Sequence, residues 1–249
     1  MRPRILIAAA NGPAPTDEAI RVLDARQSHH LVRVLRLAEG APVECFDGSG
    51  ARFDARIERA DAKACTVRLL APIAAVTESP LAITLVQGIS AAERMDWTVE
   101  KAVELGVHAI QPVVTARTQL RLDAQRLQRR HEHWARIVEA ACMQCGRDRL
   151  PVLGVPVELD RWLAESAPSP GRTRIVLDPE GAARLADLGV EGSCAVDLLV
   201  GPESGLSPPE LQAACAAGFQ AVRLGPRVLR TETAGPAAIA ALQALAGDF

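Results

Sequence analysis

LVGPESGLS, residues 199–207, joins an apolar segment to the start of a helix. Three residues indicate that helix: Ser207 can cap it, Pro208 suits its first position, and Glu210 completes a capping box. The apolar residues before the loop predict a buried strand. Because a glycine-bearing loop between strand and helix lets a ligand approach bare backbone amides, the junction predicts an α/β fold with a candidate binding loop.

A second junction of the same kind, LGPRVLRTETA, spans residues 224–234. It follows a strand candidate and opens the last helix, and it carries two arginines, an acid and two threonines. A single loop of this type would be explained as a capped, salt-bridged helix start. Two adjacent loops at strand ends favour a ligand site, because α/β sheets bind their ligands at the carboxyl ends of their strands.

From residue 80 onward, short apolar segments alternate with longer helices, which is typical of a mostly parallel sheet. Strands are predicted at residues 81–86, 174–177, 197–200 and 220–224. Helices are predicted after 90–93, which has capping-box spacing, at 123–145 and at 234–246. The first of these helices has an apolar face, formed by Met95, Val99, Ala102 and Val103. Gly106 is expected to end it.

The N-terminal part, up to about residue 70, is interpreted as short strands joined by turns. Strands are predicted at 42–46, 52–57 and 65–69, and a short helix at 28–37. Together they suggest a small β-barrel of a kind that often binds RNA. A stretch containing two prolines follows, so the predicted domains are residues 1–71 and 80–249.

Composition excludes several classes of protein. The chain has 249 residues, 49% of them hydrophobic, and a formal net charge of −2, so neither disorder nor a global basic field is expected. No apolar run reaches the roughly 20 residues of a membrane span, and no secretory signal is recognisable. A cytoplasmic protein is therefore expected, without a membrane partner.

The six cysteines are too sparse for a disulfide scaffold. Cys142 and Cys145 form a single CxxC pair, and a structural zinc site needs about four ligands. His131 and His133 lie nearby but point in different directions on a helix. No metal site is expected, and the lack of a GxGxxG after a strand disfavours a Rossmann-type enzyme.

These motifs carry a family resemblance. GPESGL and LGPRVLRTETA, together with HHLVRVLRL near the N-terminus, resemble the bacterial ribosomal RNA small subunit methyltransferase E family. Further similarities are FDGSG at 46–50, EKAVELGV at 100–107 and QCGR at 144–147. They occur in the expected order over nearly the whole chain.

The resemblance implies a PUA-like β-barrel followed by a trefoil-knotted SPOUT methyltransferase domain that works as a homodimer. It implies methylation of N3 of a uridine in 16S ribosomal RNA of the small subunit, with S-adenosylmethionine as the methyl donor. The cofactor-binding candidates that match the family motifs are Leu177, Gly201, Pro202, Glu203, Gly205, Leu224, Gly225, Val228, Leu229, Arg230 and Thr231.

Two positions depart from the family pattern. Ser204 replaces a glycine of the usual GPEGG, which would cost energy if the backbone there needed a positive φ. Gly235 and Pro236 replace good helix formers. Since proline is tolerated in the first turn only, the last helix is expected to begin near Thr233.

The catalytic candidates are Arg230 and Glu232. Arg230 could stabilise negative charge on the uracil oxygens, while Glu232 could act as base or orient Arg230. A helix-capping role for Glu232 is equally compatible with the sequence. The RNA-binding candidates are basic residues of the barrel helix and the long helix: His29, His30, Arg33, Arg36, Arg121, Arg126, Arg129 and Arg130.

Two other functions remain open at this point. The chain could be an RNA-binding assembly factor for the ribosome that has lost catalysis, or a methyltransferase of the same fold that acts on another RNA. Binding of S-adenosylmethionine separates the first of these from an enzyme. The residue types alone do not identify the RNA.

Overall fold

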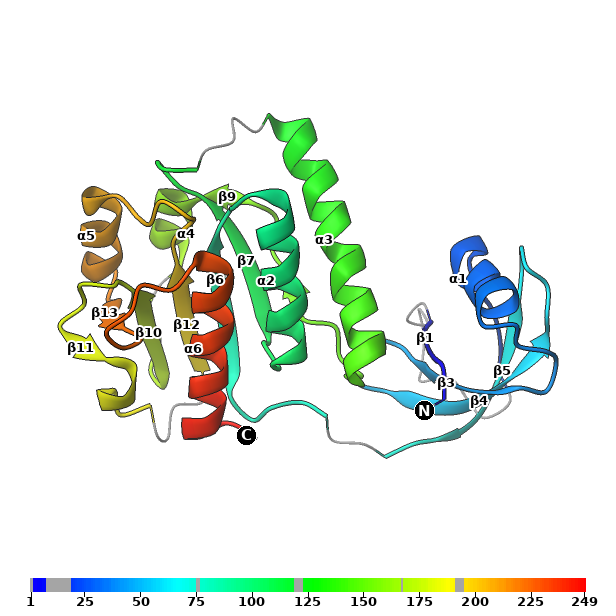
Figure 1. The fold of residues 1–249 in the computed structure, drawn as a ribbon. Coiled ribbons are helices and arrows are strands. Elements are labelled where there is room, and N and C mark those ends of the chain that lie inside the picture. Colours follow the sequence, from blue (N-terminus) through cyan, green and yellow to red (C-terminus); the bar gives the residue numbers. More distant parts are fainter. Residues whose placement is uncertain (1, 8–18, 75–76, 119–122, 167, 191–194) are drawn as a thin grey trace. The chain divides into compact units, whose positions relative to one another are not determined.

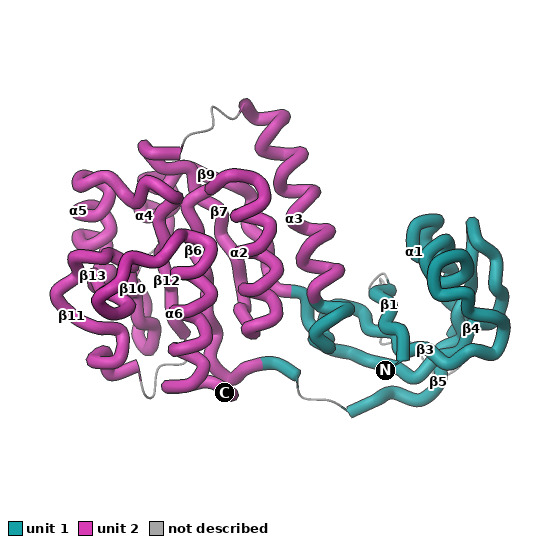
Figure 2. The backbone as a smooth tube through the Cα atoms, viewed as in Figure 1, with its two compact units in different colours: residues 1–78, 142–150 teal, residues 79–141, 151–249 magenta. Residues whose placement is uncertain are grey.

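The structure, a computed structural model, describes residues 2–7, 19–74, 77–118, 123–166, 168–190 and 195–249. Arg121, one of the RNA-binding candidates, lies outside the described residues. The chain divides into two compact units (Figure 2): unit 1 comprises residues 1–78 and 142–150, and unit 2 comprises residues 79–141 and 151–249. The segment 142–150 thus groups with the N-terminal residues, although it follows them by more than sixty positions.

Unit 1 contains a five-stranded sheet in the order β1-β3-β4-β5-β2. The strands β1 and β3 are parallel, and the other neighbours are antiparallel. Their bounds are β1 Arg4–Leu6, β2 Ile20–Val22, β3 Pro42–Phe46, β4 Arg52–Arg59 and β5 Thr66–Pro72. The three strands predicted in this region are confirmed, with ends displaced by up to three residues.

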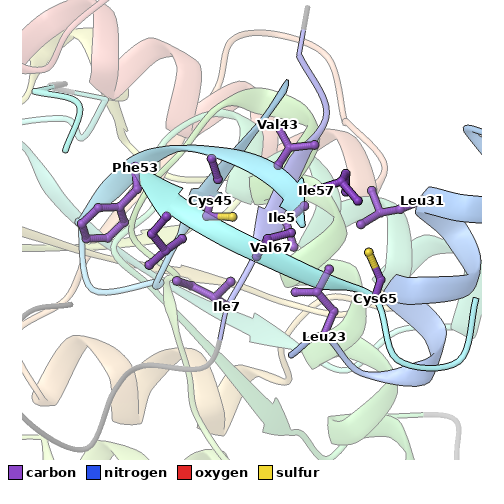
Figure 3. Close-up of a cluster of buried hydrophobic side chains, with 12 residues drawn as sticks. Ile5, Ile7, Leu23, Leu31, Val43, Cys45, Phe53, Ile57, Cys65 and Val67 are labelled. Atoms are coloured by element: carbon purple, nitrogen blue, oxygen red, sulfur yellow. The ribbon is translucent and has the colours of Figure 1, made fainter. Parts of the chain in front are cut away.

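The core of unit 1 follows from the alternation along these strands, because every second side chain points to one face of a sheet. Figure 3 shows this cluster of buried side chains, which includes Ile5, Val43, Phe53, Ile57 and Val67. Cys45 lies among them, and burial raises the pKa of its thiol to about 12. The thiol is therefore packed as a small apolar side chain.

The helix of unit 1 begins earlier than predicted. α1, Ala25–His29, is capped by Asp24, whose side chain accepts the N–H of Gln27 in a capping box. It continues as the π-helical turn η1, His30–Val34, and ends before Arg36, which has a φ of 54°. The expected bounds of 28–37 were wrong at both ends, because the Asp24 capping box and the left-handed Arg36 set the limits.

A buried charge network joins segment 142–150 to the strands of unit 1. Arg4 donates from Nη2 to Oδ1 of Asp148 at 2.7 Å and to the carbonyl of Arg147 at 2.8 Å. Arg52 lies 3.7 Å from the other oxygen of Asp148, and Arg147 pairs with Glu78 at 2.6 Å. Since Arg4 and Asp148 are both almost fully buried, each neutralises a charge that would otherwise be costly inside the fold.

Unit 2 is built on an eight-stranded sheet in the order β11-β13-β10-β12-β6-β7-β8, with β9 also paired to β7. Every strand pair that the structure describes in this sheet is parallel. The bounds are β6 Ala82–Gly88, β7 Ala109–Val114, β8 Val152–Leu153, β9 Val157–Glu158, β10 Arg172–Leu177, β11 Ala183–Arg184, β12 Ala195–Val200 and β13 Gln220–Arg223. The predicted mostly parallel sheet is confirmed.

Helices cover both faces of this sheet (Figure 1). α2 and α6 pack against one another, and α6 also contacts β6 and β12. On the other face, α4 and α5 enclose a core with side chains such as Val86, Val176 and Leu199. The bounds are α2 Ala92–Glu104, α3 Ala124–Cys145, α4 Leu159–Glu165, the 3-10 turn η2 Leu185–Asp187, α5 Pro208–Ala216 and α6 Thr231–Ala246. Among the described helices, none has the length and apolar character needed to cross a membrane.

Local signals were correct for one helix start and wrong for two. Ser207 caps α5 in the expected capping box with Glu210. The capping box predicted at Ser90 does not form, because the N-cap of α2 is Ala91 and no side chain caps it. α6 begins at Thr231 rather than near Thr233, which places Pro236 inside the helix. Packing of α6 on α2 and β6 outweighs the proline penalty there.

Removing the carboxylate of Asp148 should destabilise unit 1. Asp148→Ala leaves Arg4 as a buried charge without its closest acid, so the free energy of opening should fall by about 3–5 kcal/mol. Native-state hydrogen exchange of the β3 and β4 amides measures this change. The matched control is Asp54→Ala, which breaks an exposed pair with Arg2 and should have little effect. Equal protection in both variants would contradict the prediction.

Candidate functional site

A pocket of about 580 Å³ opens in unit 2 at the carboxyl ends of β10, β12 and β13. This is the edge at which open parallel sheets bind ligands, and the volume is in the range of small-molecule sites. All of the cofactor-binding candidates line it: Leu177, Gly201, Pro202, Glu203, Gly205, Leu224, Gly225, Val228, Leu229, Arg230 and Thr231. Glu232, the second catalytic candidate, also lines the pocket.

The first wall is the loop after β12, a strand buried along its whole length. Gly205 has a φ of 69°, whereas Ser204 is not left-handed, since Arg36 is the one described non-glycine residue with a positive φ. The replacement of the family glycine by Ser204 therefore carries no positive-φ strain. At the base of the loop, a Cβ on Gly88 would lie 2.6 Å from Cδ of Pro202, so only glycine lets the end of β6 approach so closely.

The second wall is the loop between β13 and α6. The hydroxyl of Thr231 donates to the carbonyl of Gly201 at 2.7 Å, which links the two walls directly. The side chain of Gln87, at the end of β6, donates to the Thr231 hydroxyl at 3.0 Å. Gln87 is fully buried. One hydrogen-bond chain thus holds together the ends of β6 and β12 and the start of α6. Gln87 was not identified from the sequence.

Charged groups of both signs surround the pocket. Nη1 of Arg94, in the first turn of α2, lies 3.2 Å from Oε1 of Glu203, and its Nε lies 3.7 Å from Oε1 of Glu232. The same Oε1 of Glu203 accepts the N–H of Ala91 at 2.8 Å. Oε2 of Glu232 is buried and has no hydrogen-bond partner. Such an atom calls for an explanation, because buried polar atoms are normally paired.

The loop after β7 reaches the pocket through Arg117. Its Nη1 donates to the carbonyl of Ser204 at 2.8 Å. The neighbouring Ala116 donates its N–H to Glu210 at 2.7 Å. Burial raises the pKa of Glu210, but hydrogen bonds from the backbone of Ser207 and Ala116 outweigh it, and the pKa is lowered overall. Neither Arg94 nor Arg117 was identified from the sequence, because each lies on an otherwise unremarkable helix start or loop.

Four residues of the second wall are exposed: Pro226, Arg227, Val228 and Arg230. Arg230 is the N-cap residue of α6, and its side chain makes no capping hydrogen bond. Val228 is 78% exposed. The rim of the pocket therefore presents two arginines and an apolar side chain to whatever approaches it.

None of the RNA-binding candidates that the structure describes lines the pocket. His29, His30, Arg33 and Arg36 are exposed on α1, η1 and the turn that follows, all in unit 1. Arg126 and Arg129 are exposed on α3, and Arg130 is partly buried there. Surface arginines of this kind suit phosphate contacts but are equally at home on a solvated face.

The two cysteines of the CxxC pair differ in exposure: Cys142 is buried and Cys145 is exposed. Burial raises the pKa of the Cys142 thiol to about 12. Within the described ranges, no three His, Cys, Asp or Glu side chains are grouped so that they could hold a metal ion.

Two domain families match this chain. The profile of the RNA methyltransferase domain matches residues 77–243, and that of the RNA methyltransferase PUA domain matches residues 23–70. Both matches agree with the predicted fold, a PUA-like N-terminal part followed by an α/β methyltransferase part.

Several relatives are similar over most of their length. Ribosomal RNA small subunit methyltransferase E of Buchnera aphidicola is 32% identical, covering 89% of this chain and 86% of the relative. The enzyme of that name from Mycobacterium bovis is 32% identical over 93% of this chain and 88% of its own.

Solved structures agree with these relatives. The ribosomal RNA small subunit methyltransferase E of Neisseria gonorrhoeae, bound to S-adenosylmethionine, has a TM-score of 0.92 and 38% identity, with 100% of both chains covered. A Legionella pneumophila protein in complex with the same cofactor has a TM-score of 0.93 and 35% identity, again over 100% of both chains. With this identity, coverage and domain composition, the chain belongs to the ribosomal RNA small subunit methyltransferase E family.

Proposed function

We propose that this protein transfers a methyl group from S-adenosylmethionine to N3 of a uridine in 16S ribosomal RNA of the small subunit. As a member of its family, it is an S-adenosylmethionine-dependent ribosomal RNA methyltransferase. The observation that carries the finer assignment is that Arg230 and Glu232 both line one glycine-bearing pocket. The uridine position and the residue roles are our inference from that arrangement and from the family motifs.

The pocket residues fit S-adenosylmethionine. A Cβ on Gly205 or Gly225 would meet no protein atom within 4 Å, so both glycines leave room that a ligand can occupy against the backbone. Glu203 and Glu232 bring negative charge suited to a sulfonium. We assign the loops 201–205 and 224–231 to adenine, ribose and methionine binding, largely through backbone groups.

The chemistry requires a proton to leave the base. When bound, S-adenosylmethionine supplies an electrophilic methyl group that uridine N3 can attack once its proton is removed. Glu232 lines the pocket and pairs with Arg94, and its side chain is 19% exposed, so we assign its carboxylate the role of proton acceptor. Arg230, exposed at the rim, stabilises the negative charge that develops on the uracil oxygens.

We further propose that the basic surface of unit 1 binds the RNA, through His29, His30, Arg33 and Arg36, with Arg121 and Arg129 as additional contacts. The exposure of the described members supports this role. The reaction would take place in the cytoplasm, where ribosomal subunits are assembled, and it needs neither a metal nor a membrane.

Two family properties stay predictions: the trefoil knot at the cofactor loops and the homodimer. The dimer is supported by an apolar groove of about 440 Å³ that shares Leu224 and Gly225 with the cofactor pocket and includes Ala241, Ala244 and Leu245 of α6. A second subunit seated there would lie beside the cofactor loops.

The substrate assignment is tested by calorimetric titration with S-adenosylmethionine, followed by incubation with small ribosomal subunits that lack the modification. Binding and methylation of a uridine N3, located by mapping the modified base, is the expected result. Binding without transfer to these subunits would indicate another RNA target. Absence of binding would indicate an RNA-binding assembly factor.

Arg230→Ala should lower the methylation rate by about 100- to 1,000-fold, the usual cost of losing a charge-stabilising donor. Its affinity for S-adenosylmethionine should stay close to that of the wild type. Arg161→Ala, which removes an exposed arginine paired with Glu165 on α4, is the matched control. A single-turnover rate for Arg230→Ala equal to that of the control would refute the assigned role.

RNA binding should depend on salt through the arginines of unit 1. Replacing Arg33 and Arg36 together by glutamine should weaken binding and reduce the slope of log K against log salt by about one per arginine. The matched pair is Arg56→Gln with Arg59→Gln, which removes equal charge from β4 of the same unit. Filter-binding titrations between low and high salt measure both slopes, and identical slopes would remove Arg33 and Arg36 from the interface.

The homodimer has a simple test. Sedimentation equilibrium should give twice the chain mass of 26.5 kDa. Leu245→Glu places a charge in the apolar groove of α6 and should shift the equilibrium toward the monomer, since burial of an unpaired carboxylate is costly. A wild-type protein that sediments as a monomer at micromolar concentration would contradict the proposal.

A further inference from the structure

Arg94 connects three parts of the pocket that are distant in sequence. It lies in the first turn of α2, and its side chain pairs with Glu203 of the loop after β12 and with Glu232 at the start of α6. Its backbone is held in the helix, because its N–H donates to the carbonyl of Ala91 and its own carbonyl accepts the hydroxyl of Thr98. The backbone from which the Arg94 side chain extends is therefore fixed.

The two acids depend on Arg94 to different degrees. Glu203 is also held by the N–H of Ala91, at 2.8 Å from the same Oε1. Among the described residues, Glu232 has Arg94 as its single ion-pair partner, at 3.7 Å. Loss of the guanidinium would leave Glu203 bound to the backbone, whereas Glu232 would lose the group that holds it.

Glu232 depends on Arg94 more than Glu203 does, and one of its carboxylate oxygens also lacks a hydrogen bond. Oε2 is buried without a hydrogen bond, which is costly for a carboxylate. Attraction between the Arg94 guanidinium and Oε1 offsets part of that cost. Although Oε2 is covered, the Glu232 side chain is 19% exposed and lines the pocket, so the carboxylate that Arg94 holds can reach a ligand there.

We propose that Arg94 is a positioning residue for the reaction: it acts through Glu232 and does not touch the RNA base. It holds the Glu232 carboxylate on the pocket wall, where the carboxylate can receive the uridine N3 proton. Through Glu203 it also fixes the cofactor loop relative to the start of α6. This inference rests on the proposed function, in which Glu232 is the proton acceptor.

The fold should tolerate loss of Arg94. Its side chain is 39% exposed, and partly exposed ion pairs contribute little to stability. The melting temperature of Arg94→Ala should therefore stay within about 3 °C of the wild type. A change in rate can then be attributed to the site.

The experiment compares Arg94→Ala, Arg94→Lys, Glu232→Gln and the double variant Arg94→Ala/Glu232→Gln with the wild type. Arg161→Ala again removes an exposed arginine outside the pocket as the control. Three quantities are measured: the calorimetric Kd for S-adenosylmethionine, the single-turnover methylation rate, and hydrogen exchange at residues 232–234 in the absence of ligand.

Arg94→Ala should lower the rate by about 100-fold, the cost of displacing a reacting group by about 1 Å. The Kd should change by less than about threefold, since Glu203 keeps its backbone partner. Arg94→Lys should recover about tenfold of the rate, because lysine restores the charge without the fork geometry. The double variant should be no slower than Glu232→Gln alone, since Arg94 acts through that carboxylate.

Two results would overturn the proposal: an Arg94→Ala rate equal to that of Arg161→Ala, or rate losses that multiply in the double variant. Hydrogen exchange keeps this test separate from that of the proposed function. If the wild type methylates no uridine, the proposed function fails, while exchange about threefold faster at the start of α6 in Arg94→Ala still shows that Arg94 holds this segment. Unchanged hydrogen exchange at residues 232–234 in Arg94→Ala would show that Arg94 does not hold the start of α6.

Discussion

The hydrogen bond from the Thr231 hydroxyl to the carbonyl of Gly201, 2.7 Å long, is the contact on which the site depends. It joins the loop after β12 to the start of α6, and the buried amide of Gln87 joins the end of β6 to both. Parallel strands make this possible, because their carboxyl ends all meet at one edge of the sheet. Two loops that are separate in the sequence thereby become the facing walls of one pocket.

The arginines around the pocket fall into two groups, one paired with the pocket walls and one exposed at the rim. Arg94 and Arg117 bind acids or carbonyls of the pocket walls, and so serve to hold the loops in place. Arg227 and Arg230 are exposed at the rim. This division suits an enzyme whose substrate is a polyanion, since paired cations keep the pocket ordered while the exposed ones remain available for RNA. The net charge of −2 makes such local arrangements necessary.

Most secondary structure could be predicted, but its ends could not always be. The capping box at Ser207 formed because Glu210 lies three residues away on the same helix. The equivalent spacing at Ser90 and Glu93 forms no capping box, because α2 begins after Ala91. The N–H of Ala91 instead donates to Glu203, which lies on a loop distant in sequence. Pro236 led to a wrong start for α6 for a similar reason. The contacts of α6 with α2 and β6 stabilise a helix that begins at Thr231, earlier than the proline alone predicts.

The sequence by itself determined the α/β class, the parallel sheet and the two glycine-bearing loops, because periodicity, capping and turn chemistry act within a few residues. The cofactor candidates, which came from the family motifs, all line the pocket. Only the tertiary structure decided that Gln87, Arg94 and Arg117 belong to the site, and that segment 142–150 groups with the N-terminal unit. These residues have no distinctive local pattern: their positions follow from the order of strands in the sheet, which long-range packing selects.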